Sequence, residues 1–252
     1  MLKRRIIPIQ LLLNGRLVKS QRFDNWRDVG DPVKSSAVYN SQYADELIFL
    51  NIARDRASVQ PLAELMQKVS QECFMPLAVG GGIRSFDDAA YLIQNGADKV
   101  VINSAAYSDH QLISRIAERF GTQAVVVAID AKREGDSYVT LSASASQAET
   151  VTLEEHIHAC EAAGAGEFLI QSVDQDGTMK GFDLALLRIA CSAARVPVIG
   201  CGGSGQYNHL KEAFLETDVS ALACGSLFNF SDSNPLRAKA FLSNYGLQFK
   251  VV

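Results

Sequence analysis

Val79-Gly80-Gly81-Gly82-Ile83 has a counterpart near the end of the chain, Gly200-Cys201-Gly202-Gly203-Ser204, and each stretch closes a short apolar run. The two glycine pairs are 121 positions apart (202 − 81). Glu46 and Glu167, each at the start of another apolar run, keep the same offset. Internal repeats constrain a fold strongly, because each copy must form the same unit. We therefore expect one half-unit used twice.

Eight short apolar runs alternate with longer amphipathic stretches, some of which begin with capping-box spacing, as in Ser85-Phe86-Asp87-Asp88 and Thr152-Leu153-Glu154-Glu155. Continuous apolar runs are typical of strands buried on both faces. Eight strand–helix units predict a single (β/α)8 TIM barrel of two half-barrels, about 1–120 and 121–252. A doubly wound open sheet is the alternative, but a closed barrel accommodates two equal halves more naturally. The predicted strands are 6–13, 46–52, 76–80, 99–103, 124–130, 167–173, 196–201 and 219–224.

The composition disfavours nucleic acid and membranes as partners. The formal net charge is −4, and no segment approaches the roughly 18–20 apolar residues of a membrane span. The basic start Met1-Leu2-Lys3-Arg4-Arg5 leads into an apolar run broken by Pro8, and no signal-peptide cleavage site follows. The five cysteines are scattered and odd in number, as is typical of reduced thiols. We therefore expect a cytoplasmic protein.

Polar and glycine residues follow four of the predicted strands, at the barrel end where such folds carry their chemistry. Glycine lets backbone N–H groups approach an anion closely. A single glycine pair is most simply a tight turn, but two pairs in symmetry-related places favour phosphate binding. We expect a long ligand with a phosphate at each end. The candidate phosphate-binding residues are Gly81, Gly82, Asn103, Ser104, Gly202, Gly203, Gly225 and Ser226.

The segment 14–30 is far longer than a usual strand–helix connection. It carries four basic and two acidic side chains in an acidic protein, with Trp26 among them. Either it is a basic lid over an anionic ligand, with Lys19 as the candidate lid residue, or it is a solvated surface loop. Charge alone leaves both interpretations open.

The four histidines fall on predicted helices or beside them, away from strand ends, and no grouping along the sequence has zinc-site spacing. We expect His156 and His158 to be two solvated helix residues. We accordingly expect neither a metal nor a cofactor.

Motifs along nearly the whole chain closely resemble the cyclase (synthase) subunit of imidazole glycerol phosphate synthase. The resemblance implies that ammonia from a glutaminase partner enters the bottom of the barrel. The ammonia then reacts at the top with a bis-phosphorylated aminoimidazole carboxamide ribonucleotide. The matching segments include Asn14-Gly15-Arg16-Leu17-Val18-Lys19, Val29-Gly30-Asp31-Pro32, Val79-Gly80-Gly81-Gly82-Ile83-Arg84-Ser85, Val127-Ala128-Ile129-Asp130, Asp176-Gly177-Thr178 and Gly202-Gly203-Ser204-Gly205.

The resemblance also implies catalytic aspartates, and here the chain departs from the family pattern. Asp130 matches the aspartate at the end of the fifth strand, and Asp176 is a further catalytic candidate. The partner aspartate of the first strand is replaced by Leu11, although the internal repeat places that position at Gln10 or Leu11. Removing one member of an acid–base pair costs about 10²–10⁴-fold in rate. Two further departures are Asn51, where the family has an aspartate, and the stretch Leu141-Ser142-Ala143-Ser144-Ala145-Ser146 in place of a glycine-containing loop.

The other end of the barrel keeps the pattern of the family. Its charged gate at the ammonia entrance matches four residues at predicted strand starts, and Asp98 lies in the region that faces the glutaminase. Without the resemblance, charges at strand starts would be assigned to stabilising salt bridges. The gate residues are Arg5, Glu46, Lys99 and Glu167.

Three functions follow from this combination. The first is an ammonia-conducting subunit that binds a glutaminase and supplies a third protein, which amidates a sugar for surface polysaccharide. The second is a true cyclase, a lyase of histidine biosynthesis. The third is an isomerase of a related bis-phosphate, which would need no glutaminase. Because Leu11 cannot transfer a proton, the sequence favours the first and makes cyclase activity of the chain itself doubtful.

Overall fold

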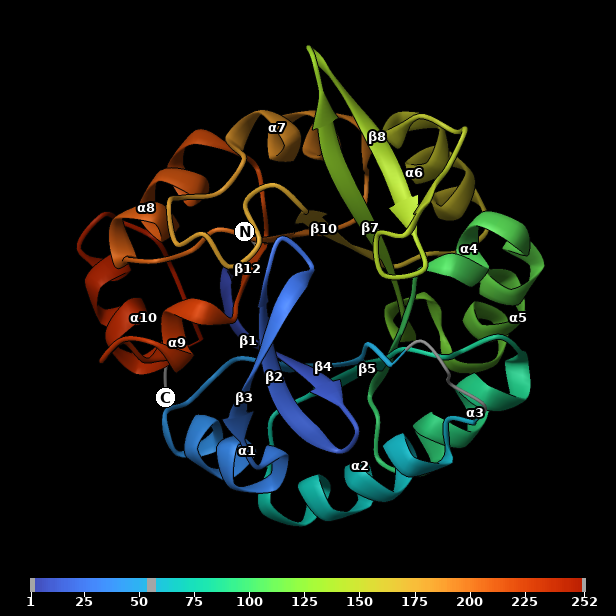
Figure 1. Ribbon diagram of the computed structural model, residues 1–252, viewed down its shortest axis with the longest axis horizontal. Helices are drawn as coiled ribbons and strands as arrows, with labels where there is room; N and C mark the ends of the chain where they lie inside the picture. Colours follow the sequence, from blue (N-terminus) through green and yellow to red (C-terminus); the bar gives the residue numbers. More distant parts are fainter. Residues whose placement is uncertain (1–2, 54–57, 251–252) are drawn as a thin grey trace.

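The structure, a computed structural model, describes residues 3–53 and 58–250. Met1 and Leu2, part of the basic start considered above, lie outside this range. Eight parallel strands close into a barrel, because the first strand pairs with both the second and the last (Figure 1). The predicted (β/α)8 barrel is confirmed. In barrel order the strands are β1 (Arg5–Leu13), β4 (Leu47–Asn51), β5 (Leu77–Gly80), β6 (Lys99–Ile102), β7 (Val125–Glu134), β10 (Glu167–Ser172), β11 (Val198–Cys201) and β12 (Ala221–Cys224).

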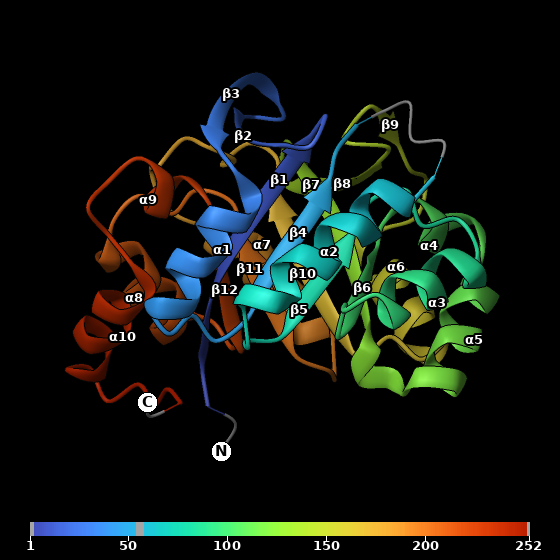
Figure 2. The ribbon, with the colours of Figure 1, turned by 90° about the horizontal axis from the view of Figure 1, so that it is seen from below.

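Two antiparallel extensions rise from one end of the barrel (Figure 2). After β1 the chain turns back as β2 (Arg16–Gln21) and β3 (Asp24–Gly30), and after β7 it forms β8 (Ser137–Ser142) and β9 (Gln147–Ala148). The expectation of a loop over 14–30 is therefore wrong: it is a β-hairpin. The reason is local pairing, since β2 continues the ladder of β1 and its four central residues are buried.

Helices form the outer ring of the barrel (Figure 1). The capping boxes predicted at Ser85 and Thr152 are present, with each hydroxyl accepting from the backbone N–H three residues on. Asp31 caps the first helix in the same way, directly before Pro32. The helices are α1 (Pro32–Ser41), α2 (Gln60–Glu72), α3 (Phe86–Gln94), α4 (Ser104–Ser108), α5 (His110–Phe120), α6 (Leu153–Ala162), α7 (Leu184–Ala193), α8 (Tyr207–Glu216), α9 (Ser226–Asn229) and α10 (Pro235–Ser243), with a 3₁₀ turn at Thr122–Ala124.

Two separate apolar clusters make the core. The larger lies between the strands and the helices and includes Phe49, Met66 and Phe168, all fully buried. The smaller fills the barrel interior with small and β-branched side chains. Strands buried on both faces explain the continuous apolar runs in the sequence. The interior cluster is Ile7, Ile9, Ile48, Ala78, Val101, Val126, Ala128, Leu169, Ile199, Cys201, Ala221 and Ala223.

Among the described residues, none of the helices combines the length and the apolar character needed to cross a membrane. The division into half-barrels near residues 120 and 121 stays a prediction, although the helix α5 ends and the strand β7 begins close to it.

Candidate functional site

Two adjoining hollows lie at the end of the barrel where the strands finish. The larger, of about 500 Å³, is lined by Gly81, Gly82, Asn103, Ser104 and Asp130. The smaller, of about 30 Å³, is lined by Lys19, Asp176, Gly202, Gly203, Gly225 and Ser226. Leu11, Ser20 and Gln171 line both. The structure thus brings the two predicted glycine sites to one mouth, with a shared wall between them.

The glycines have a structural reason as well. Gly81 has φ +102°, and a Cβ there would lie 2.1 Å from the carbonyl oxygen of Asn51. Gly203 has φ +103°, and a Cβ would lie 2.0 Å from the carbonyl oxygen of Gly181. Only glycine tolerates both the left-handed backbone and the close approach. Tight turns therefore account for these two residues, and phosphate binding stays a prediction.

Asp130 lies where β7 reaches the mouth and is 7% exposed. Its Oδ2 accepts a hydrogen bond of 3.4 Å from Asn103 Nδ2. Burial and the negative charge of Asp176 raise the pKa of Asp130 to about 7, partly opposed by the bond from Asn103. A carboxyl group with this pKa holds and releases a proton near neutral pH, as a general acid or base must.

Asp176 holds the β2–β3 hairpin against the mouth. Its Oδ2 accepts from Ser20 Oγ at 2.7 Å and from the Phe23 backbone N–H at 3.2 Å. Burial raises its pKa, partly offset by the bond from Ser20. Because Asp176 makes these contacts with residues of the hairpin, its first role is to position the hairpin.

Lys19, the candidate lid residue, is buried at the mouth. It lies on β2, is 5% exposed and donates from Nζ to the carbonyl oxygen of Ile9. Burial lowers its pKa to about 8, and the charge of Asp176 opposes this. The side chain of Lys19 points inward, and its role as a lid residue stays a prediction. The side chain forms a wall of the smaller hollow, next to Gly225.

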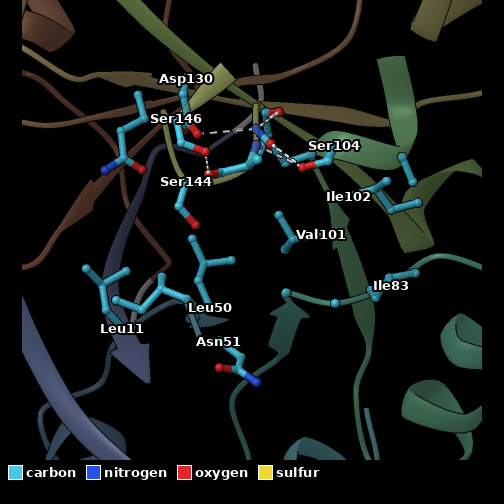
Figure 3. A pocket seen from close by; sticks show the side chains of 18 of the residues that line it. Leu11, Leu50, Asn51, Ile83, Val101, Ile102, Ser104, Asp130, Ser144 and Ser146 are labelled. Atoms are coloured by element: carbon cyan, nitrogen blue, oxygen red, sulfur yellow. Dashed lines mark hydrogen bonds between the residues drawn. The ribbon is translucent and has the colours of Figure 1, made fainter. Parts of the chain in front are cut away.

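Leu11 occupies the place that the family pattern gives to an aspartate. It is 8% exposed, lines both hollows and pairs in register with Leu50 (Figure 3). The neighbouring Gln10 faces away from the mouth, because its Nε2 donates to Ser35 Oγ of α1 at 2.6 Å. Of the two positions that the repeat allowed, Leu11 is therefore the one at the site, and it offers no proton.

The other two departures also lie at the larger hollow. Asn51 ends β4 and accepts from the Ala53 backbone N–H at 3.1 Å. In the turn after β8, Ala143, Ser144 and Ala145 all have positive φ, at 51°, 57° and 59°. The Ala143 N–H donates to Ser104 Oγ at 3.0 Å, which fixes the turn over the first glycine site. Three consecutive left-handed non-glycine residues store strain at the mouth.

Gln171 is a site residue that the motif search missed. It is the last residue but one of β10, is 6% exposed and lines both hollows. Its position at a strand end was the available signal, since the barrel rule selects strand ends. Ser20 was missed because the hairpin that carries it was expected to be a loop.

The four charged residues predicted as a gate form one closed ring where the barrel strands begin. Arg5 pairs with Glu46 at 2.8 Å and also with Glu167. Lys99 pairs with Glu46 at 2.9 Å and with Glu167 at 2.8 Å. Asp98, nearby, accepts from the Leu77 backbone N–H at 2.8 Å and so caps the start of β5. The geometry establishes the ring of ion pairs, while its role as a gate stays a prediction.

The histidines are not all solvated. His158 is exposed, as expected, but His156 is 2% exposed and stacks on Tyr107 with the ring centroids 3.8 Å apart. Burial and the nearby His110 lower the pKa of His156 to about 4. The interpretation of His156 as solvated is wrong, because the helical face that carries it packs on α4. Although no grouping along the sequence has zinc-site spacing, the fold brings His110, His156 and Cys160 together, and the expectation of no metal stays a prediction.

The chain was compared with known proteins. Residues 5–233 match the family model described as "Histidine biosynthesis protein". A relative from Dehalococcoides mccartyi, named imidazole glycerol phosphate synthase subunit HisF, is 43% identical over 251 residues, covering 100% of this chain and 99% of its own length. Relatives with the same name from Hyphomonas neptunium and Chloroherpeton thalassium are each 41% identical, over 252 and 251 residues, with 100% of both chains covered.

These relatives overturn the first functional hypothesis. The expected role in sugar amidation for surface polysaccharide, with a third protein as acceptor, rested on three departures at the mouth. The similarity instead runs over the full length to subunits of imidazole glycerol phosphate synthase, so that expectation is wrong. The chain belongs to the histidine biosynthesis protein family, together with the HisF subunits of imidazole glycerol phosphate synthase.

Proposed function

We propose that this chain is the cyclase subunit of an imidazole glycerol phosphate synthase. Its substrate is then a bis-phosphorylated aminoimidazole carboxamide ribonucleotide, with ammonia as the nitrogen donor. The observation that carries the proposal is the pair of adjoining glycine-lined hollows, of which the larger contains Asp130. Full-length similarity to HisF subunits supports the same substrate.

The two hollows suit a ligand with two anionic ends. The larger hollow has room for the ribonucleotide body and one phosphate, and the smaller accepts only a small group. Lys19, with a pKa of about 8, is largely charged at neutral pH and is part of the wall of the smaller hollow. A bound phosphate stabilises the ammonium form further, because an opposite charge nearby favours ionisation. Backbone N–H groups at the glycine turns provide the remaining donors.

Asp130 is the proton-transfer group of this proposal. Its pKa of about 7 allows it to accept a proton from one reacting atom and return it to another. The opposite wall offers Leu11, so the second proton must come from water or from the substrate itself. Turnover is therefore expected to lie about 10²–10⁴-fold below that of a site with two carboxylates. Asp176 supports the site by holding Ser20 and Phe23.

Ammonia enters, in this proposal, through the ring of Arg5, Glu46, Lys99 and Glu167. A glutaminase subunit would dock on the face where the strands begin and release ammonia there. Apolar side chains fill the barrel between the ring and the mouth. They favour neutral ammonia over ammonium, because burying an unpaired charge costs far more than burying a small neutral molecule.

The test is ammonium-driven turnover of the ribonucleotide by the isolated chain at high pH, with the products separated by chromatography. Slow cyclisation that falls a further hundredfold or more in Asp130→Asn is expected, since the remaining proton-transfer group is lost. Asp136→Asn, an exposed aspartate in the turn after β7, is the matched control and should leave the rate unchanged. Absence of product under single-turnover conditions, or equal rates in wild type and Asp130→Asn, would refute the proposal.

A further inference from the structure

Three groups that bind transition metals gather on the outer ring of the barrel, behind Ser108 and Asp109, which line the larger hollow. His110 is the first residue of α5, and His156 and Cys160 lie on the next long helix, α6 (Figure 1). Their ligand atoms all lie within 4.8 Å of one another. No step proposed for the mouth uses any of them.

The pair on α6 already has the spacing of metal ligands. His156 and Cys160 are four residues apart, so both project from one face of the helix. The Cys160 sulfur lies 3.8 Å from Nδ1 and 3.7 Å from Nε2 of His156. In a tetrahedral zinc site, bonds of about 2.3 Å to sulfur and about 2.0–2.1 Å to nitrogen place the two ligand atoms roughly 3.6 Å apart. Because both nitrogens are almost equally distant from the sulfur, neither lone pair points at it. The Cys160 side chain therefore has to turn about its Cα–Cβ bond to share an ion with one of them.

The surroundings hold the pair in place and leave one side accessible. Tyr107 of α4 stacks on the His156 ring with an interplanar angle of 4°. Cys160 is fully buried and is a free thiol. Among residues 3–53 and 58–250, the Cys160 sulfur is the one polar atom within hydrogen-bond distance of a ring nitrogen of His156. His110, by contrast, is exposed, so an ion can enter from its side.

We propose that His110, His156 and Cys160 form a binding site for a zinc-class divalent ion, with water as the fourth ligand. Imidazole nitrogen and thiolate sulfur are the donors that zinc and cobalt(II) prefer. On binding, the Cys160 thiol gives its proton to the buffer and the thiolate coordinates the ion, with no change of oxidation state. The ion then joins α5 to α6. It therefore stabilises the folded protein by an amount that grows with the logarithm of the ratio of its concentration to the dissociation constant.

The experiment uses the full-length protein stripped with a chelator and titrated with cobalt(II). We expect about one ion per chain, visible d–d bands of a tetrahedral ion, and a near-ultraviolet thiolate-to-cobalt charge-transfer band. Cys160→Ser should lose the charge-transfer band. His110→Ala should weaken binding by more than roughly tenfold, a loss typical even of outer-shell partners. His110→Ala is the more secure variant because its side chain is exposed and its removal leaves the helix packing intact.

His158→Ala is the matched control, since His158 is an exposed histidine on the same helix but outside the cluster. Its spectrum and affinity should equal those of wild type. A second measurement is the thermal midpoint, which zinc should raise in wild type and in His158→Ala but not in His110→Ala. The proposal is overturned if wild type shows no charge-transfer band. It is equally overturned if Cys160→Ser keeps that band, or if His110→Ala binds as tightly as wild type.

Discussion

Replacing Leu11 by aspartate should raise the rate of ammonium-driven cyclisation. Leu11 lines both hollows opposite Asp130, so a carboxylate there reaches the space in which the substrate would react. A positioned proton-transfer group contributes about 10²–10⁴-fold, which corresponds to roughly 3–5 kcal/mol of transition-state stabilisation. The side chain is 8% exposed, so the substitution also loses about 1.5–3 kcal/mol of apolar burial and lowers the stability of the fold.

Leu11→Asn is the matched control, because asparagine has the shape of aspartate and the same loss of apolar burial but transfers no proton. Steady-state turnover of both variants should be measured across pH, with folding checked by urea denaturation. A second carboxylate near Asp130 should also move the acid limb of the pH profile upward, since a like charge raises the pKa of Asp130 beyond about 7. Equal turnover of the two variants at every pH would show that a lost base does not limit this site.

Four other predictions concern stability, binding and coupling. Asp130→Asn should be more stable than wild type by an amount that grows by roughly 3 kcal/mol between pH 5 and pH 8 in urea titrations. Up to about pH 7 the carboxyl is protonated in the folded state but ionised in the unfolded state, so wild-type stability is lost as pH rises through about 7. A difference in stability that does not change with pH would contradict the raised pKa. Ala145→Gly should raise the free energy of unfolding by about 1 kcal/mol, because glycine adopts the left-handed backbone of this position without strain. Ser146→Gly should lower the free energy of unfolding, because it removes the hydrogen bond from the Ser146 hydroxyl to the Ala143 carbonyl oxygen. Gly203→Ala should abolish the binding of inorganic phosphate at the smaller hollow, as measured by calorimetry. Gly246→Ala is the control, because Gly246 also has a positive φ but open space around it, and it should bind phosphate as wild type does. Unchanged phosphate binding by Gly203→Ala would leave the glycines as turn formers alone. Lys99→Ala should destabilise the fold by up to about 3–5 kcal/mol, because it leaves a buried carboxylate without its partner. In the complex with a glutaminase, the same variant should raise the ratio of glutamate released to product formed. Arg16→Ala, which breaks an exposed ion pair, should leave that ratio unchanged.

The barrel was predictable because its signal is periodic and local. Each strand is a continuous apolar run, and capping boxes such as the one at Thr152 mark the helices between them. The two hairpins at the mouth were less visible. Leu17 and Val18 are apolar and Lys19 and Ser20 are polar, yet all four are buried in the folded protein. The charge of the segment left a lid and a solvated loop both open, and contacts with distant residues, such as that of Ser20 with Asp176, decided the burial.

The mouth was predictable where a motif ends a strand and not where contacts come from distant segments. Gly81, Asp130 and Gly202 lie where the strand rule placed them. The cluster of His110 with Cys160 has no sequence signature, because its members come from two helices that only the fold brings together. The functional prediction failed for another reason: three substitutions at the mouth of the barrel were given more weight than similarity along the whole chain.

The charged ring at the bottom of the barrel also bears on how the two repeats depend on each other. Both cations, Arg5 and Lys99, and the anion Glu46 belong to the first repeat, while the second repeat supplies only Glu167. At the positions 121 residues after the cations, the second repeat has Val126 and Ser220. Separated from its counterpart, the first repeat would keep one surplus positive charge, and the second an unneutralised carboxylate. The ring is therefore neutral only when both repeats contribute to it, and the two copies are not interchangeable.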